Sequence, residues 1–363
     1  WIHACSVGEA QVAATLAHAI KAKEPEISIW FTATTPSGLQ RLRALCPDHA
    51  VALFPWDFPW VWGPWLAHCA PRALVLIETE LWPNLMAACA NRELPVVLAN
   101  GRLSARSAQG YARWRGLTQP LWKQLQLALM QGLDDRERAI ALGADALRCQ
   151  VMGSVKFDQP APPPDPNLVA RLKTWVGTRP LMALISSHSG EEVAVINAIQ
   201  SLRPDWALIC VPRHPVRARD LCQQIDQATL LSSSALPADA VLFVDRFGAI
   251  GSVLSLTTVA LLGGTWVPHG GQNPIEIARW DCPIIAGPHV FNFAETCSGL
   301  VSVGGLMHAT LPELSAAIVS VAAQREARGH AAHVWVDQQA GATARQAAAV
   351  LALLSHSDAP VRG

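Results

Sequence analysis

Residues 263–276 read Gly-Gly-Thr-Trp-Val-Pro-His-Gly-Gly-Gln-Asn-Pro-Ile-Glu and follow the apolar, strand-like run Val259–Leu262. The stretch leads into a helix-like segment, so it connects a strand to a helix. Glycine lets a backbone approach a ligand closely and leaves N–H groups free, and amides at a helix start favour anions. Asn273 and Glu276 lie one helical turn apart and suit the vicinal hydroxyls of a ribose. The stretch therefore predicts a nucleotide site in the second half of the chain.

The composition is that of a folded protein with a large core. The chain has 363 residues, of which 51% are apolar and 15% charged, which excludes disorder and allows two domains. The net formal charge is zero, so no partner nucleic acid is expected. Nine cysteines without CxxC pairs favour a reducing compartment. No apolar run reaches transmembrane length and no signal peptide is visible, and we expect an N-terminal piece to precede Trp1.

Short apolar runs alternate with helix-like segments along the chain, which predicts parallel sheets covered on both faces. The proline cluster at 159–166 interrupts this series and is typical of a linker. We therefore predict an α/β protein with two doubly wound domains that face a central cleft. The expected parts are residues 1–158, a linker at 159–178, and residues 179–363, whose last helix is free to cross back to the first domain. The predicted strands are 1–5, 27–32, 51–54, 73–77, 96–99, 127–131, 149–152, 181–186, 207–211, 241–244, 259–262 and 283–286.

Three carboxylates follow strands in the first half. Glu9 comes after the first strand, in Ser6-Val-Gly-Glu, where it is suited to accept a proton from an attacking hydroxyl. Glu78 and Glu80 follow the strand at 73–77. Acidic residues also favour the first turn of a helix through its dipole alone, and this simpler explanation stays open for all three.

Cations and aromatic rings gather in other segments of the first half. Residues 94–133 contain Arg102, Arg106 and three further cations but no acid, which suits either an anionic acceptor or a solvated helix face. The ring-rich segment 54–65 favours a packed loop and helix over a bilayer interface. Lys156, in Gly153–Asp158, is placed to stabilise developing negative charge, although a surface lysine is the default.

Several loops of the second half also follow strands. Arg213, held between two prolines in Pro212–Pro215, is suited to pair with a phosphate or carboxylate. Ser186–Glu192 suits either an anion or an ordinary helix cap. Residues 245–249 and 287–292 end further strands of this half, so these loops are expected to surround one site. The twelve histidines form no HxxxH or HxH pair, and no metal is expected.

Taken together, these segments resemble the Kdo transferases of lipopolysaccharide synthesis, which add 3-deoxy-D-manno-octulosonic acid (Kdo) to lipid A precursors. Eight motifs of that family occur here in the same order. They are Ser6–Glu9, Glu78–Asn84, Asn100–Ser104, Gly153–Asp158, His188–Glu192, Pro212–Pro215, Gly270–Glu276 and Gly287–Phe293.

The resemblance implies a GT-B fold, with the acceptor bound by the first half and the donor CMP-Kdo by the second. It implies that Glu9 is the general base and that Glu80 and Lys156 stabilise the transition state. The CMP-binding positions that it implies are Pro212, Arg213, Phe247, Gly248, Ala249, Asn273, Pro274, Ile275 and Glu276.

The chain departs from the family pattern at a few of these positions. Family members have Asn at Ser154, His at Gln272, Leu at Ile275, and Met-Gly-Glu at 247–249. They also carry an N-terminal membrane anchor that this sequence lacks.

The implied reaction is an inverting, metal-independent transfer of Kdo from CMP-Kdo to lipid IVA or a related precursor, without a cofactor. The implied place is the cytoplasmic face of the bacterial inner membrane, with Arg102 and Arg106 near the acceptor. Two other functions stay open. One is another GT-B nucleotide-sugar enzyme, such as a UDP-sugar transferase or 2-epimerase, and the other is a non-catalytic protein that binds nucleotide sugars.

Overall fold

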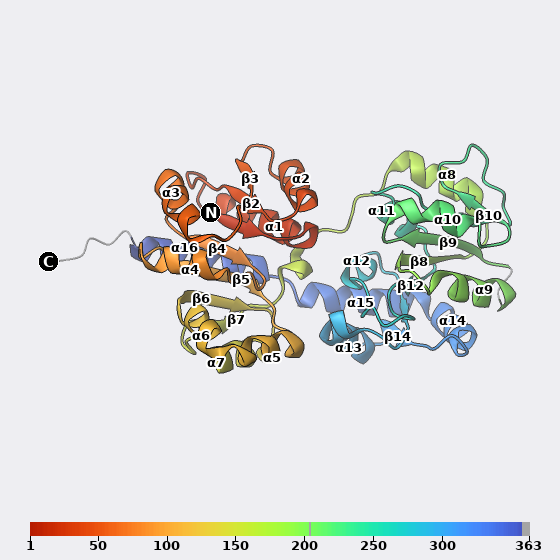
Figure 1. Cartoon of the computed structure of the whole chain (residues 1–363). Coiled ribbons are helices and arrows are strands. Elements are labelled where there is room, and N and C mark those ends of the chain that lie inside the picture. The colour runs from red at the N-terminus through yellow and green to blue at the C-terminus, as the bar shows by residue number, and fades with distance from the viewer. Residues whose placement is uncertain (203–204, 358–363) are drawn as a thin grey trace. The chain divides into compact units, whose positions relative to one another are not determined.

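The computed structural model describes residues 1–202 and 205–357, which form two compact units (Figure 1). Unit 1 consists of residues 1–159 and 339–363, and unit 2 consists of residues 160–338. Both units are α/β, as predicted, and each is built on a parallel sheet with helices on both faces.

Unit 1 contains a seven-stranded parallel sheet with the order β3-β2-β1-β4-β5-β6-β7. The chain starts in the middle of this sheet, builds outward to β3, and then returns to lay β4 on the other side of β1. The strands are β1 (Ile2–Ala4), β2 (Phe31–Ala33), β3 (Val51–Leu53), β4 (Leu74–Ile77), β5 (Val96–Gly101), β6 (Leu125–Met130) and β7 (Cys149–Val151).

Alternate strand residues of unit 1 enter two separate cores, because successive side chains of a strand point to opposite faces. Leu74 and Leu76 join the core under α3, α4, α6 and α7, whereas Val75 and Ile77 join the core under α1, α2 and α16. The helices are α1 (Val7–Lys23), α2 (Pro36–Leu45), α3 (Pro59–Cys69), α4 (Pro83–Ala90), α5 (Ala105–Arg113), α6 (Arg115–Lys123), α7 (Leu133–Leu142) and α16 (Ala342–Ser357).

Unit 2 repeats the same design with the order β10-β11-β9-β8-β12-β13-β14. Its strands are β8 (Leu181–Ser187), β9 (Ala207–Pro212), β10 (Ala228–Leu230), β11 (Val241–Phe243), β12 (Val259–Leu262), β13 (Ile284–Ala286) and β14 (Leu306–His308). All of the strand pairs are parallel. The two edge strands β10 and β14 were not predicted from the sequence.

Helices α9, α10 and α14 cover one face of the sheet of unit 2 and share its core. On the other side, α11 packs on β8 and α8 packs on α11. The helices are α8 (Pro166–Val176), α9 (Glu192–Leu202), α10 (Ala218–Cys222), α11 (Ile250–Leu254), α12 (Ile275–Ala278), α13 (Ala294–Ser302), α14 (Leu314–Ala323) and α15 (Arg325–Gln338).

Part of the predicted linker at 159–178 is helical. The helix α8 begins at Pro166, because the side chain of Asp165 accepts hydrogen bonds from the amides of Asn167 and Leu168 and proline is favoured at a first helical position. Residues 166–176 of the expected linker thus form α8, which packs on α11 of unit 2.

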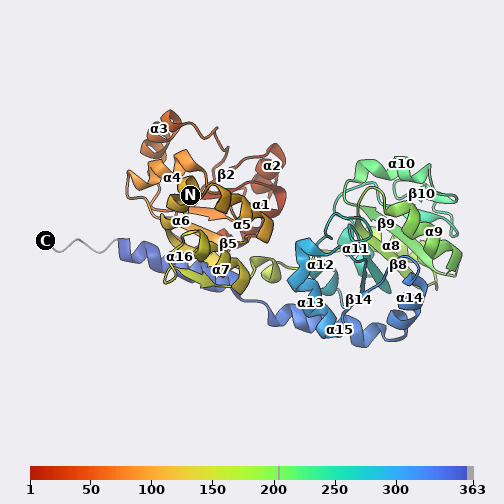
Figure 2. The same cartoon turned by 60° about the horizontal axis from the view of Figure 1, so that its bottom comes forward.

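The helix α16 returns the end of the chain to unit 1, and Figures 1 and 2 both show it lying along that unit. Asp158 fastens its start, because Oδ2 accepts from the Thr343 amide at 2.6 Å and from the Thr343 hydroxyl at 2.7 Å, and Oδ1 accepts from the Gly341 amide. Deeper in unit 1, Gln346 accepts from the amide of Asn100 at 2.8 Å and donates to the carbonyl of Gly153 at 3.1 Å.

These bonds tie the segment 153–158, which carries Lys156, to both α16 and β5. The Asn100 side chain completes the connection by accepting from the Val155 amide at 3.0 Å. Within the described residues, no helix is long and apolar enough to cross a bilayer.

We expect Asp158→Ala to destabilise unit 1 by about 1–2 kcal/mol, because it leaves the first amides of α16 without their acceptor. Urea unfolding followed by tryptophan fluorescence measures the loss. Asp48→Ala, at an exposed position of the same unit, is the control and should change stability by less than about 0.5 kcal/mol. Equal unfolding midpoints for the two variants would contradict the capping role of Asp158.

Candidate functional site

The predicted carboxylates of unit 1 lie at the point where the strand order reverses. The first strand β1 neighbours β2 on one side and β4 on the other, so the carboxyl ends of β1 and β4 flank this switch point. Ligands of doubly wound sheets bind at such a crevice. Glu9 follows β1, and Glu78 and Glu80 follow β4, so the fold brings together residues that lie about 70 positions apart in the sequence.

Glu9 lies in the first turn of α1 and is held by the segment before it. Its Oε2 accepts from the Cys5 amide at 2.7 Å, and its Oε1 accepts from the Ser6 hydroxyl at 2.8 Å. The Ser6 hydroxyl in turn accepts from the Glu9 amide, so Ser6 is the N-cap of α1. Each carboxylate oxygen still has a second lone pair that is free to accept a proton.

The pKa of Glu9 is raised from its ordinary value, mainly because burial disfavours the charged form. The Cys5 amide opposes this shift, and the negative charge of Glu78 adds to it. Burial also raises the pKa of Glu80, to about 7, with further contributions from Glu9 and then Glu78. The neighbouring carboxylates thus influence each other's protonation, as coupled pairs do in catalytic sites.

Lys156 is paired with Glu78, whose Oε1 lies 3.0 Å from its Nζ. Both side chains are about four-fifths buried, and Glu78 adopts a left-handed backbone conformation with φ of 61°. That conformation is uncommon for a residue with a side chain and turns the chain sharply after β4. Lys156 therefore reaches the carboxylate group, and its direct partner is Glu78.

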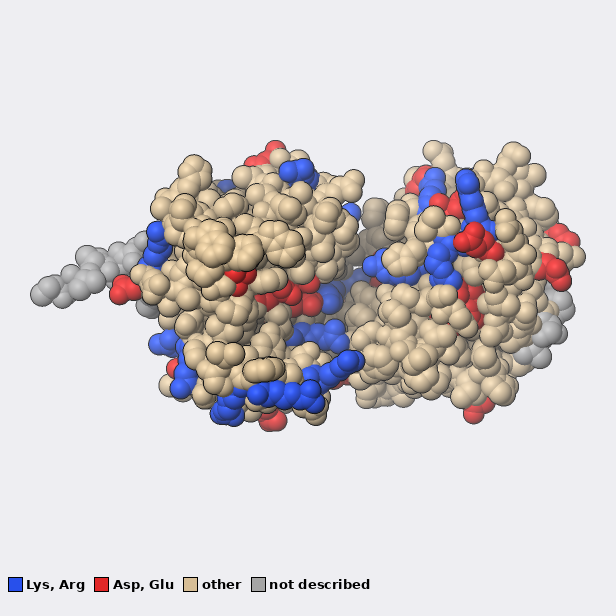
Figure 3. All heavy atoms as spheres, viewed as in Figure 1, with Lys and Arg blue, Asp and Glu red and all other residues tan. Residues whose placement is uncertain are grey.

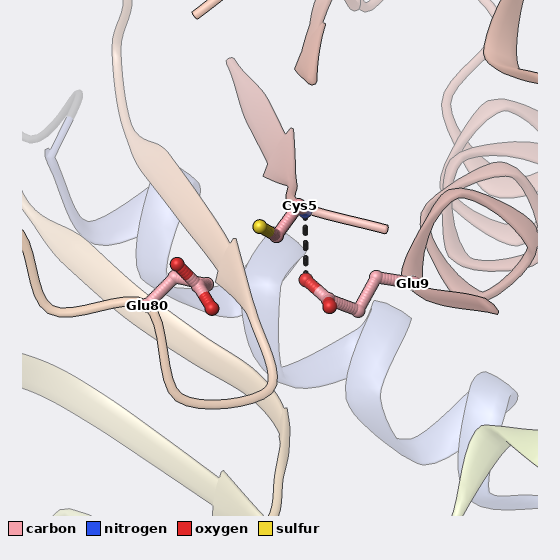
Figure 4. Close-up of side chains that lie close together, drawn as sticks. All are labelled: Cys5, Glu9 and Glu80. Atoms are coloured by element: carbon pink, nitrogen blue, oxygen red, sulfur yellow. Dashed lines mark hydrogen bonds between the residues drawn. The ribbon is translucent and has the colours of Figure 1, made fainter. Parts of the chain in front are cut away.

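Figure 4 shows Glu9 and Glu80 directed toward Cys5 from two different segments. The ligand atoms of Cys5, Glu9 and Glu80 all lie within 4.8 Å of one another, which is a spacing that could hold a metal ion. The carboxylate of Glu9, however, already accepts two hydrogen bonds. Its charge also raises the pKa of Glu80, which favours the protonated form of that second carboxylate. Metal independence stays a prediction.

The predicted acceptor cations lie on the neighbouring strand and helix. Arg102 directly follows β5 and is half-buried, and its carbonyl accepts from the Thr79 hydroxyl within the loop of Glu78 and Glu80. Arg106 is exposed on α5, a helix without buried residues. In Figure 3, Lys and Arg residues gather over the part of unit 1 where α5 and α6 lie.

In unit 2 the strand order reverses between β8 and β12. The glycine-rich loop, residues 263–272, follows β12, and Ser187–Glu191 follows β8. The loop approaches β8 closely, since a Cβ on Gly263 would lie 2.5 Å from the carbonyl oxygen of Ser186. Gly263 thus lies close to the protein's own backbone, and a close approach of this loop to a ligand stays a prediction.

The expectation that this loop leaves its amides free is wrong for several positions. The amides of Gly271 and Gln272 donate to the carbonyls of Gly264 and Gly263, and the Ile275 amide donates to the Asn273 side chain. The amides of Gly264 and Trp266 donate to the carboxylate of Glu191, at 2.5 and 3.1 Å. The loop folds on itself and onto a buried acid, so its own structure uses these donors.

Glu191 and Glu192 are both buried, with 1% of each exposed. Glu192 pairs with Arg217 at 2.6 Å and accepts from the Ser187 hydroxyl at 3.2 Å. Burial raises the pKa of Glu191, while the amides that it accepts from lower it. The separate partners of the two acids could not be predicted from the sequence, because Gly264, Trp266 and Arg217 lie in other segments and leave no local pattern.

Three further side chains meet at the entrance of the glycine-rich loop. The rings of His188 and His269 stack with their centroids 3.6 Å apart. Nε2 of His188 lies 2.7 Å from Nε2 of the Gln272 side chain. Burial lowers the pKa of His188 to about 4, with smaller contributions from His269 and from neighbouring arginines. His188 is therefore neutral near pH 7, with Nε2 accepting from the side chain of Gln272, one of the residues at which the chain departs from the Kdo transferase pattern.

The remaining predicted donor residues occupy adjoining strand ends of unit 2. Arg213 is exposed and directly follows β9. Burial raises the pKa of Glu276, and the charge of Arg213 opposes this shift. Phe247 is 77% exposed at the start of α11, beside Gly248, whereas Ala249 is buried. Pro212, Pro274 and Ile275 are buried and shape the loops rather than present polar atoms. Asn273 and Glu276 both lie at the start of α12.

Comparisons with known proteins point to one family. Residues 1–159 match the model of the 3-deoxy-D-manno-octulosonic-acid transferase (kdotransferase) family. A 3-deoxy-D-manno-octulosonic acid transferase of Haemophilus influenzae is 32% identical over 361 residues, which cover 95% of this chain and 84% of that protein. The transferase of the same name from Bordetella pertussis is 33% identical over 375 residues, covering 95% and 85%.

Solved structures share the fold across both units. The UDP-GlcNAc 2-epimerase of Neisseria meningitidis, solved with UDP-GlcNAc bound, matches 98% of this chain and 99% of its own with a TM-score of 0.65. Its sequence identity is 12%, so this likeness concerns the fold alone. The predicted GT-B type of α/β architecture is confirmed.

We expect Glu80→Gln to remove a pH-dependent loss of stability. The folded pKa of Glu80, about 7, lies above the ordinary value of 4.5, so the folded state binds the proton more tightly. Stability from this group is present below pH 4.5 and is lost as pH rises toward 7. The variant should gain roughly 1–2 kcal/mol over the wild type across that window, a discounted value because the group is partly solvated.

Urea unfolding at closely spaced pH values measures this difference. Glu137→Gln, at an exposed position of α7, controls for the loss of one carboxylate. Parallel stability curves for wild type and Glu80→Gln would contradict the raised pKa of Glu80.

Proposed function

The chain belongs to the 3-deoxy-D-manno-octulosonic acid transferase family, and we propose that it transfers Kdo from CMP-Kdo to lipid IVA in lipopolysaccharide core biosynthesis. The observation that carries this proposal is the carboxylate group at the switch point of unit 1, where Glu9 and Glu80 meet in a partly buried site. A glycosyl transfer needs a base for the acceptor hydroxyl at such a position. The second unit supplies nucleotide-binding residues at its own switch point.

In the proposed reaction, an oxygen of Glu9 takes the proton of the acceptor hydroxyl while that hydroxyl oxygen bonds to the anomeric carbon of Kdo. The bond from this carbon to the phosphate oxygen breaks, and CMP leaves with the electron pair from the opposite face, so the configuration inverts. The hydrogen bonds from Cys5 and Ser6 fix the orientation of the base. No metal or cofactor enters the proposal.

The other residues of unit 1 support the same step. Burial and the negative charge of Glu78 raise the pKa of Glu9, which favours proton transfer at neutral pH, and Glu80 beside it is the proposed partner in transition-state stabilisation. Lys156 pairs with Glu78, and its positive charge therefore lies beside the carboxylates. There it is proposed to stabilise the negative charge that develops in the transition state. These roles match those that the family resemblance implies.

The donor is proposed to bind at unit 2. Arg213 is the proposed partner of the CMP phosphate, since it is exposed and its loop is fixed by Pro212 and Pro215. Asn273 and Glu276 are the proposed partners of the ribose hydroxyls. Phe247 is exposed and offers a ring face to the base. Because several glycine-loop amides are occupied, side chains carry most of this recognition.

The acceptor and the membrane surface are proposed to meet unit 1. Arg102 and Arg106 are the proposed partners of lipid phosphates. Aromatic residues are also exposed on this unit, with Trp56 at 83% and Trp60 at 71%. Exposed indole rings and cations are typical of proteins that lie at a bilayer surface. We therefore place the reaction at the cytoplasmic face of the inner membrane.

Incubation of lipid IVA with CMP-Kdo and the protein should add Kdo masses, detected by mass spectrometry. Glu9→Gln should lower the rate by about 10²–10⁴, because the amide cannot accept the proton, while CMP binding persists. Calorimetry with CMP provides the control for an intact unit 2. Substantial turnover by Glu9→Gln would exclude Glu9 as the base, and no product with wild type would exclude the proposed reaction.

We expect Asn273→Ala and Glu276→Ala each to weaken CMP binding by about tenfold, or about 1.4 kcal/mol, through loss of hydrogen bonds to the ribose. Glu326→Ala, at an exposed position of α15 in the same unit, is the control and should keep the wild-type affinity. A thermal-shift panel adds the nucleotide preference, since CMP should stabilise the protein and UDP should not. Unchanged CMP affinity in both variants would contradict the ribose assignment.

A further inference from the structure

We propose that Glu191 is a positioning residue for the donor site, because its carboxylate fills an anion-binding set of backbone amides and thereby holds the glycine-rich loop in its binding form. This inference rests on the proposed function and deepens it. It concerns a residue that contacts loop backbone rather than the reacting atoms.

The amides come from both strands that flank the switch point of unit 2. Oε1 of Glu191 accepts from the His188 amide at 2.9 Å and from the Gly264 amide at 2.5 Å, and Oε2 accepts from the Trp266 amide at 3.1 Å. The bond to His188 is a local helix-start contact. The bonds to Gly264 and Trp266 span 73 and 75 positions and join the loop after β12 to the loop after β8.

This set of amides lies where doubly wound folds bind ligand anions. Here the protein supplies the anion itself. With only 1% of Glu191 exposed, the carboxylate is shielded from water, so its hydrogen bonds to these amides are strong. A donor phosphate cannot use the same amides while Glu191 occupies them.

The clamped loop leads directly into Asn273 and Glu276, two of the residues proposed to bind the donor. Gly264 lies against the ring of His188, as a Cβ at Gly264 would lie 3.2 Å from Cδ2 of that ring. The loop continues to His269 and Gln272, which hold His188 by stacking and by a hydrogen bond, and then to Asn273. Displacement of the loop at Gly264 and Trp266 would therefore shift the donor-binding residues together.

Glu192 provides a matched comparison within the same chain. It has the same burial, but its partners are Ser187 and Arg217, and no bond joins it to the glycine-rich loop among the interactions of the described residues. Loss of Glu192 leaves Arg217 without its partner in an ion pair. Loss of Glu191 leaves three backbone amides without their acceptor. The two variants separate general destabilisation from loop positioning.

The test uses Glu191→Ala, with CMP affinity measured by calorimetry and loop protection measured by hydrogen exchange of peptides covering 263–272. We expect CMP to bind at least about tenfold more weakly and the loop amides to exchange faster. Formate, at up to about 0.1 M, should fill the vacated amides and restore both CMP affinity and protection. Chloride at equal ionic strength controls for screening.

Glu191→Gln is the second variant, in case the alanine variant fails to fold. Its carbonyl can still accept from His188 and Gly264, but its NH2 group faces the Trp266 amide, so we expect an intermediate CMP affinity without a formate response. Glu192→Ala should lower the melting temperature, and formate should not change its loop exchange.

Each outcome decides between distinct conclusions. Wild-type CMP affinity and loop protection in Glu191→Ala would overturn the positioning role. Weaker CMP binding with no formate response, equal to that of Glu192→Ala, would also overturn it, because the loss would then be one of general stability. If the wild type itself binds no CMP, the proposed function fails, and the formate effect on loop exchange still tests the clamp on its own.

Discussion

Repulsion among three carboxylates at one sheet edge is the constraint on which the site of unit 1 depends. Glu9, Glu78 and Glu80 converge because β1 and β4 are neighbours that end at the same edge. The chain offsets the repulsion in three ways, with Lys156 beside Glu78, amide and hydroxyl donors on Glu9, and a raised pKa at Glu80. The carboxylates therefore influence one another's protonation, which a fully neutralised set of ion pairs would not do.

Unit 2 also contains a buried carboxylate, but backbone amides rather than a cation stabilise its charge. Glu191 is buried as deeply as any acid of the described chain, yet no cation is its partner, and backbone amides surround it instead. Hydrogen bonds to peptide groups stabilise a buried carboxylate without adding a mobile side chain. The glycines around it matter for the same reason, since Gly263 approaches the backbone of β8 where a Cβ would collide.

The fold class could be predicted from the sequence, because short apolar runs alternate with helix-like segments. The candidate residues could be predicted to follow strands, because polar, glycine-bearing turns mark strand ends, whereas their roles stay predictions. The edge strands β10 and β14 were missed, since Ala228–Leu230 and Leu306–His308 are three residues long and only partly buried. The roles of Glu191 and Gln346 were also missed, because their partners lie 73 to 246 positions away. Side chains that contact such distant residues leave no periodic signal in the sequence. The expectation of free glycine-loop amides failed partly for this reason, at Gly264 and Trp266, and partly because the loop bonds to itself at Gly271 and Gln272.

The return of α16 to unit 1 has a consequence for biosynthesis on the ribosome. Ala347 and Val350 belong to the core that α1 forms on one face of the sheet of unit 1, and Asp158 and Asn100 find their partners in the same helix. That face stays incomplete until residue 350 has been translated. The later-encoded unit is thus able to fold first, while the nascent earlier unit exposes apolar surface that chaperones recognise.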